Sequence, residues 1–188
     1  MIFPVTALGP GKRVGIWTIG CYKRCEKCAN PELRIFDETK DIKISDVSKM
    51  LKNIPIDEVS GITISGGEPF AQAKGLKEML TLFSSFCEDI LVFSGYTYEE
   101  LKLSTDNNVR ECLEYIDVLI AGEYIDQLND NQTALVGSSN QEIHFLNTNL
   151  ESKYQKYMGM GRQIQNVFYG NDMMSIGIHN RLGASCIL

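Results

Sequence analysis

The chain has 188 residues, of which 44% are hydrophobic and 22% charged, and its formal net charge is −6. A chain of this length favours one domain with its own core, and an acidic balance argues against nucleic-acid binding, which needs a basic surface. No apolar run approaches the ~20 residues that span a bilayer. The first residues lack the features of a signal peptide. We therefore predict one cytoplasmic domain over 1–188, with a core over about 13–150, a C-terminal extension over about 151–188, and no nucleic-acid or membrane partner.

Strands and helices are predicted to alternate through the first half of the chain. Residues 13–19 (RVGIWTI) are rich in β-branched and aromatic residues, which predicts a strand that runs into Gly20 and Cys21. A polar loop follows, and apolar residues then recur at helical spacing over 45–54, with Ser45 as the expected N-cap. The next predicted elements are a strand over 61–65, a helix over 70–86 and a strand over 89–94.

The second half continues this alternation and ends in a hairpin. The segment Thr97-Tyr98-Glu99-Glu100 is a capping box, which begins a helix toward Leu103. Further along, the pattern predicts a helix over 108–115, strands over 116–121 and 142–146, and a hairpin of 165–169 with 173–178 around Gly170-Asn171-Asp172. Such alternation is typical of an α/β fold with a mainly parallel sheet, here with a C-terminal β-hairpin.

Small or polar residues follow four of the predicted strands. Cys21, Gly66, Ser94 and Gly122 stand where these strands end. Ligands of α/β sheets bind at the carboxyl ends of the strands. We therefore predict a binding site along this edge of the sheet.

The cysteines are the strongest chemical signal in the sequence. Without a signal peptide, six cysteines indicate metal or redox chemistry rather than disulfides. Cys21, Cys25 and Cys28 are spaced closely enough for their thiolates to bind one iron–sulfur cluster, and three ligands leave the fourth iron of a cubane open for S-adenosylmethionine (SAM). A non-catalytic iron–sulfur or structural zinc site is the alternative, although structural zinc commonly uses four ligands.

The remaining cysteines show no such pattern. Cys87 and Cys112 lie in helix-like surroundings and are expected to be small buried hydrophobic residues. Cys186 has no assigned role, and neither do Glu123 and His144.

A glycine-rich motif follows the strand at 61–65. It reads Ser65-Gly66-Gly67-Glu68-Pro69. Two glycines let a ligand approach the backbone closely, and the carbonyls together with Glu68 offer acceptors for an ammonium group such as that of SAM. An ordinary turn between a strand and a helix is the alternative interpretation.

The two motifs together, CxxxCxxC followed by GGEP, resemble those of the radical SAM superfamily. Further segments resemble its anaerobic ribonucleotide reductase activating branch, a group of glycyl-radical activases; they are residues 15–30, 64–72, 93–101, 115–124 and 137–146. The resemblance implies a partial, incomplete β/α barrel in which Cys21, Cys25 and Cys28 bind a 4Fe–4S cluster. It also implies that Ser65, Gly66, Gly67, Glu68, Ser94 and Asn140 contact SAM. The residue before the third cysteine, which contacts the adenine in many members of the superfamily, is Lys27 here, so Tyr22 or Trp17 is expected to cover the adenine instead, although Trp17 also fits a core position.

The function implied by this resemblance is an oxidoreductase of the radical SAM type. The reduced cluster cleaves SAM to methionine and a 5′-deoxyadenosyl radical, which abstracts hydrogen from a glycine of a partner glycyl-radical enzyme. A flavodoxin or ferredoxin is the expected electron donor. The alternatives are a radical SAM enzyme that acts on a small molecule or a peptide, and a non-catalytic iron–sulfur or zinc protein.

Overall fold

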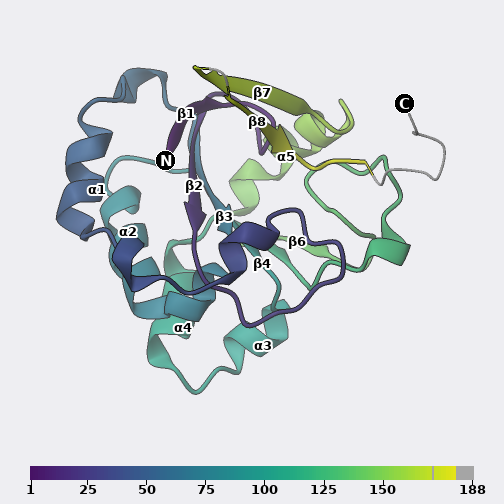
Figure 1. Ribbon diagram of the computed structural model, residues 1–188, viewed down its shortest axis with the longest axis horizontal. Helices are drawn as coiled ribbons and strands as arrows, with labels where there is room; N and C mark the ends of the chain where they lie inside the picture. Colours follow the sequence, from purple (N-terminus) through teal and green to yellow (C-terminus); the bar gives the residue numbers. More distant parts are fainter. Residues whose placement is uncertain (171, 181–188) are drawn as a thin grey trace.

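A six-stranded sheet forms the centre of the molecule in the computed structural model, which describes residues 1–170 and 172–180 (Figure 1). The strands follow each other across the sheet in chain order. They are β1 (Ile2–Val5), β2 (Arg13–Thr18), β3 (Gly61–Gly66), β4 (Ile90–Ser94), β5 (Val118–Ala121) and β6 (Glu142–Phe145). The inner strands β2 to β5 pair in parallel, and β1 and β6 pair antiparallel at the two edges. The predicted α/β fold with a mainly parallel sheet is confirmed.

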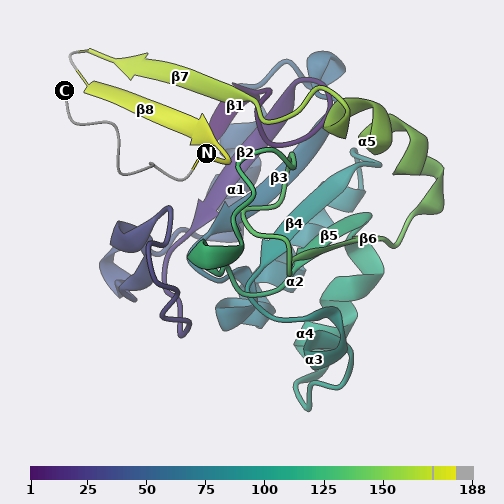
Figure 2. The same ribbon diagram turned by 90° about the vertical axis from the view of Figure 1, so that its right-hand side faces the viewer.

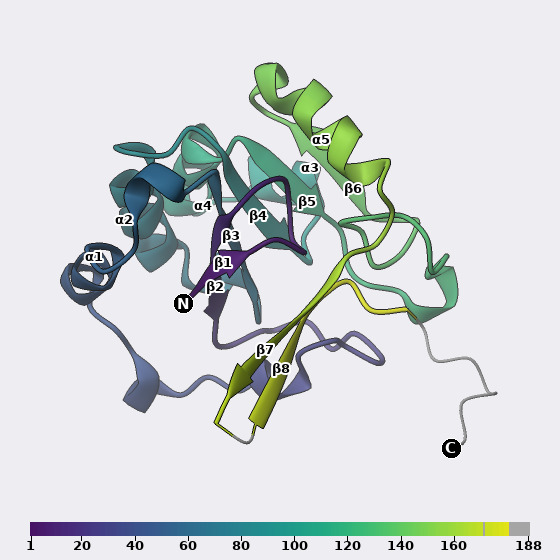
Figure 3. The same cartoon turned by 90° about the horizontal axis from the view of Figure 1, so that it is seen from above.

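Helices cover one face of this sheet (Figure 3). They are α1 (Ile44–Leu51), α2 (Ala73–Ser84), α3 (Tyr98–Lys102) and α4 (Asn107–Cys112). Alternate strand residues such as Ile62, Ile64 and Val92 point to this side and pack with Leu80 and Phe83 of α2 in the main core. No helix in residues 1–170 and 172–180 is long and apolar enough to cross a membrane.

The C-terminal segment covers part of the opposite face (Figure 2). Helix α5 (Glu151–Met158) buries Tyr154 and Tyr157 against Leu91 and Ile120. The hairpin of β7 (Ile164–Tyr169) and β8 (Asp172–Gly177) packs through Ile176 in a small cluster with Val5, Leu8 and Trp17. The predicted hairpin is confirmed in its described part, and Asn171 of its turn lies outside the described residues.

Several local predictions differ from the structure. Helix α1 begins at Ile44, after Lys43, and has no side-chain cap, so the predicted N-cap at Ser45 is wrong. Strand β1 was not expected, because it has four residues and contains Pro4. Helix α5 was not expected either, because its sequence ESKYQKYM is mostly polar and only its two tyrosines are buried. The capping box at Thr97 is confirmed, since its side chain accepts from the backbone N–H of Glu100.

A buried ionic network joins the amino-terminal ends of the central strands to α5. Arg13 is fully buried and donates to Asp89 at 2.9 Å and to Thr63 at 2.6 Å. Asp89 also accepts from Tyr154 at 2.6 Å and pairs with Lys153 at 2.5 Å. Burial alone would raise the pKa of Asp89, but attraction to Arg13 and these hydrogen bonds bring its pKa below the usual value. The network fixes the end of the sheet opposite the predicted site.

Candidate functional site

The residues predicted from the sequence lie along one edge of the sheet. In the parallel register, Thr18 of β2 pairs with Gly66 of β3, and Ser94 of β4 pairs with Ala121 of β5. The carboxyl ends of four strands are therefore neighbours, and the cysteine loop leaves β2 directly beside the motif that ends β3 (Figure 1). We call this edge the strand-end rim.

The two glycines of the motif let the cysteine loop pack against β3. The backbone N–H groups of Gly67 and Glu68 donate to the carbonyls of Thr18 and Gly20 at 2.8 and 2.9 Å. A Cβ at Gly67 would lie 2.7 Å from the carbonyl oxygen of Leu33 and closer still to that of Gly20. Gly66 has a φ of +112°, which L side chains rarely adopt. Both glycines are thus needed where the loop backbone passes.

Glu68 ties the ends of β3 and β4 together. Its side chain is 1% exposed, and its carboxylate accepts from Ser94 Oγ at 3.0 Å, from the N–H of Gly95 at 2.7 Å and from that of Phe70 at 3.1 Å. Burial raises the pKa of Glu68, and these hydrogen bonds limit the rise. The structure therefore brings two predicted site residues, Glu68 and Ser94, into direct contact.

Three thiols stand on one loop beside this rim. Cys21 is buried, whereas Cys25 and Cys28 are half-buried. The loop is closed by hydrogen bonds from the N–H groups of Gly20 and Cys21 to the carbonyls of Leu33 and Arg34, at 2.8 and 3.0 Å. Burial raises the pKa of the Cys21 thiol. Burial, together with the neighbouring carboxylate of Glu123, raises the pKa of Cys25 to about 11.

The chemistry of these donors fits an iron–sulfur cluster. Cys87 and Cys112 are buried in the main core, as expected, so neither belongs to the loop, and Cys186 lies outside the described residues. As the side chains of the described residues stand, no three His, Cys, Asp or Glu groups are placed to hold a metal ion. Cys28 nevertheless lies close enough to Cys21 and Cys25 to contribute, after burial, to the raised pKa of each of these thiols. A cubane offers a separate iron to each thiolate, and coordination deprotonates the thiols.

Two lysines that the sequence did not single out as contacts connect the cysteine loop to the rim. Lys27 has a φ of 52°, and its Nζ lies 2.9 Å from Asp126, a carboxylate that is 3% exposed. The Nζ of Lys23 lies 4.4 Å from the ring centroid of Tyr96. The only sequence feature that distinguished either lysine was the position of Lys27 directly before the third cysteine.

The other predicted site residues are more peripheral. Tyr22 is 66% exposed, and its ring lies against that of Phe36 with centroids 4.8 Å apart. Asn140 donates from Nδ2 to the carbonyl of Glu123 at 2.8 Å, so it holds the loop that faces Cys25. His144, which had no assigned role, stacks on Tyr98, with ring centroids 4.6 Å apart.

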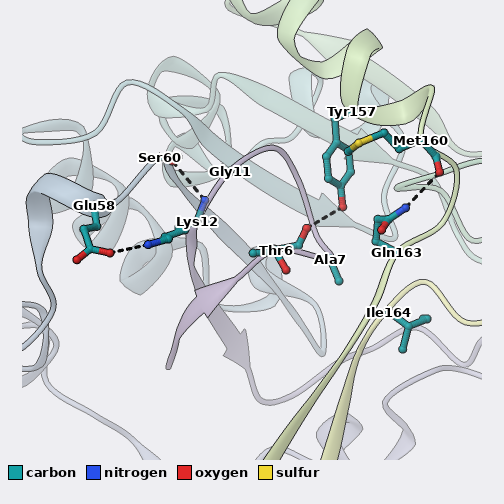
Figure 4. Close-up of a pocket in the computed structure, with 10 residues that line it drawn as sticks. All are labelled: Thr6, Ala7, Gly11, Lys12, Glu58, Ser60, Tyr157, Met160, Gln163 and Ile164. Atoms are coloured by element: carbon teal, nitrogen blue, oxygen red, sulfur yellow. Dashed lines mark hydrogen bonds and ion pairs between the residues drawn. The ribbon is translucent and has the colours of Figure 1, made fainter.

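A cavity of about 590 Å³ lies at the end of the strands opposite the rim (Figure 4). Tyr157 donates there to the carbonyl of Thr6 at 3.1 Å, and Lys12 pairs with Glu58 at 2.7 Å. Lys12 precedes β2, so this cavity is remote from the cysteine loop. Its polar groups are already paired with each other, and it contributes nothing to the rim.

The fold and the cysteine loop agree with a class of small iron–sulfur proteins. Residues 7–144 match the model of the 4Fe-4S single cluster domain family, which covers strands β2 to β5, most of β6 and the strand-end rim. Several curated relatives share a single name, anaerobic ribonucleoside-triphosphate reductase-activating protein. The relative from Vibrio cholerae is 31% identical over 154 residues, which cover 76% of this chain and 94% of the relative.

Two further relatives with this name give the same result. The protein from Haemophilus influenzae is 32% identical over 143 residues, 72% of this chain and 89% of the relative. The protein from Escherichia coli K12 is 26% identical over 152 residues, 77% and 96% of the two chains. The chain therefore belongs to the family of the anaerobic ribonucleoside-triphosphate reductase-activating proteins, and the resemblance to this activase branch is confirmed.

Proposed function

We propose that the protein is a radical SAM activase that introduces a glycyl radical into an anaerobic ribonucleotide reductase in the cytoplasm. The observation that carries this proposal is the packing of the three-thiol loop against Gly66 and Gly67, on the rim where Glu68 and Ser94 meet. Its relatives, which are named as reductase-activating proteins, support the choice of partner.

The residues of the rim have distinct roles in this proposal. Cys21, Cys25 and Cys28 hold a 4Fe–4S cluster and leave one iron open. The backbone of Ser65, Gly66 and Gly67 offers carbonyls to the ammonium of SAM. Glu68 keeps these carbonyls in place, because its own carboxylate is buried and bound to Ser94 and Gly95. Such preorganised acceptors replace the water that an ammonium loses on binding.

The surrounding side chains complete the SAM site. Ser94 lies at the end of β4 and is the proposed polar contact to the ribose or carboxylate of SAM. Tyr22 is the proposed cover of the adenine, and its exposed ring is free to meet a ligand on one face. Asn140 positions the backbone of Glu123 beside Cys25. In this interpretation the open sheet, with β1 and β6 at its edges, is the incomplete β/α barrel of the superfamily.

When bound and reduced by one electron, the cluster supplies the cleavage of SAM to methionine and a 5′-deoxyadenosyl radical, which removes a hydrogen atom from the glycine. The cysteine loop and the rim loops orient the reactants for this chemistry. A flavodoxin or ferredoxin is the proposed donor of the electron.

Electron paramagnetic resonance on the partner tests this function. The protein is reconstituted without oxygen, reduced with dithionite, and mixed with SAM and the anaerobic ribonucleotide reductase of the same organism. We expect the doublet of a glycyl radical on the reductase. Cys25→Ala abolishes the signal, whereas the matched change Cys87→Ala, which lies in the core, retains it.

Two results would contradict the proposal. One is a protein with a full cluster that produces no radical on the reductase. The other is a Cys25→Ala protein that still carries about four irons, since this would remove Cys25 from the ligand set. SAM cleavage linked to turnover of a small molecule or a peptide, without any radical on the reductase, would favour another radical SAM activity.

A further inference from the structure

The outer side of the cysteine loop carries an exposed apolar surface. Ile35 and Phe36 are 73% and 47% exposed, and large apolar side chains that lie together on a surface commonly mark a binding site. They border a cleft of about 410 Å³ that Arg24, Pro31, Arg34, Ile35 and Phe36 line. We call Arg24, Arg34, Ile35 and Phe36 the loop patch.

The loop patch is basic although the chain as a whole is acidic, since it contains Arg24 and Arg34 and no acidic residue. Residues 21–36 hold four Lys and Arg against two Glu, a net charge of +2 in a chain whose net charge is −6. Arg24 donates to the carbonyl of Cys21 at 3.0 Å, and Arg34 donates to that of Cys25. Among the ion pairs of the described residues, within 4.0 Å, neither arginine has a carboxylate partner. Each guanidinium thus keeps its charge and most of its five N–H donors for a partner.

The side chains of the patch are not those that reach the strand-end rim. Lys23 and Lys27 reach Tyr96 and Asp126, which follow β4 and β5, so this flank of the loop faces the rim. Arg24 and Arg34 instead line the cleft together with Ile35 and Phe36. The backbone of the same segment passes Gly67 at Leu33, so the cleft begins close to the rim. Both arginines nevertheless bond to the backbone of proposed cluster ligands. A partner seated on the patch is therefore close to the proposed cluster, and it contacts side chains other than those that reach the rim.

We propose that the loop patch is the docking surface for a small acidic protein that carries one electron. An occupant that needs the cluster but not SAM or the substrate glycine is an electron carrier, and unpaired arginines around apolar side chains complement an acidic carrier surface. This inference rests on the proposed function. One electron leaves the carrier, which is oxidised, and enters the cluster, which is reduced; no bond forms or breaks.

A single charge placed in the patch tests this inference. Ile35→Glu adds a carboxylate to the cleft that both arginines line, at a side chain that is 73% exposed. Leu103→Glu adds the same charge at a side chain that is 78% exposed, after α3. Binding of labelled oxidised flavodoxin to the reconstituted protein is measured by fluorescence anisotropy. The rate at which reduced flavodoxin is oxidised by the protein is measured by stopped flow without oxygen.

For Ile35→Glu we expect the affinity for flavodoxin and the rate of flavodoxin oxidation to fall about three- to ten-fold at low ionic strength. The reason is that charges at the periphery of an interface act mainly on association. Leu103→Glu should retain the values of the unaltered protein. The rate for the unaltered protein should fall as salt is added, since salt screens the attraction. Equal values for the two variants, or a rate that salt does not affect, would overturn the inference.

Chemical reduction separates this inference from the proposed function. With dithionite, Ile35→Glu should form 5′-deoxyadenosine at the normal rate. If the unaltered protein forms none, the proposed function fails, whatever the carrier does. If dithionite supports cleavage but Ile35→Glu lowers only the yield of radical on the reductase, the patch binds the reductase, and the docking of a carrier is overturned.

Discussion

At the scale of single residues, Gly67 decides how closely the cysteine loop approaches β3. Its N–H donates to Thr18, and there is no room for a Cβ beside the carbonyls of Gly20 and Leu33. The glycine-rich motif at 65–69 therefore has a structural role in addition to its proposed contact with SAM. Because Gly20 directly precedes Cys21, a displacement at Gly67 reaches the first proposed ligand of the cluster.

We expect the Gly67→Ala protein to bind less iron per chain than the unaltered protein while it stays folded. The added methyl group pushes the loop backbone away and separates Cys21 from the other two thiols. Gly75→Ala is the control, because nothing lies within 4 Å of the added Cβ in α2, and it should stabilise the helix by about 0.5–1 kcal/mol. Iron per chain after anaerobic reconstitution is the measurement, with circular dichroism to check the fold. Full iron loading of Gly67→Ala would show that the close packing is not needed.

At the scale of elements, Arg13 and Asp89 hold four elements together. Arg13 begins β2, Asp89 directly precedes β4, and their network includes Thr63 of β3 and Tyr154 of α5. Removing one partner of such a buried pair leaves the other charge without compensation, which costs about 3–5 kcal/mol. The network thus accounts for how a mostly polar helix is fixed on the sheet.

Asp89→Asn should lower the free energy of unfolding by about 3–5 kcal/mol at neutral pH, as measured with urea. Asp46→Asn, which breaks an exposed pair with Lys49, should cost less than about 0.5 kcal/mol. The folded-state pKa of Asp89 is depressed, so its contribution is present above its unfolded pKa of about 3.9 and is lost as the pH falls through the folded pKa. Asp89→Asn should therefore lose less stability below about pH 4 than the unaltered protein does. Equal stability of the two proteins at pH 7 would refute this role.

At the scale of the whole molecule, the sequence predicted those features that local patterns encode. The continuous apolar strands, the capping box at Thr97 and the four strand ends were recognisable because each depends on neighbouring residues. The pairs Arg13–Asp89 and Lys27–Asp126 were not, because each joins residues far apart in the chain. Helix α5 was not predicted for the same reason, because its two tyrosines become buried only when they pack against the sheet. The site residues could be located on one rim, but their contacts with each other required the structure.

The central claim is that the three thiols of one loop hold a cluster that cleaves SAM. The most direct measurement is 5′-deoxyadenosine formed by the reconstituted protein with dithionite and SAM, in the absence of any partner enzyme. The account predicts 5′-deoxyadenosine together with methionine from the unaltered protein, and none from Cys25→Ala. A protein with a full 4Fe–4S cluster that forms no 5′-deoxyadenosine would contradict it.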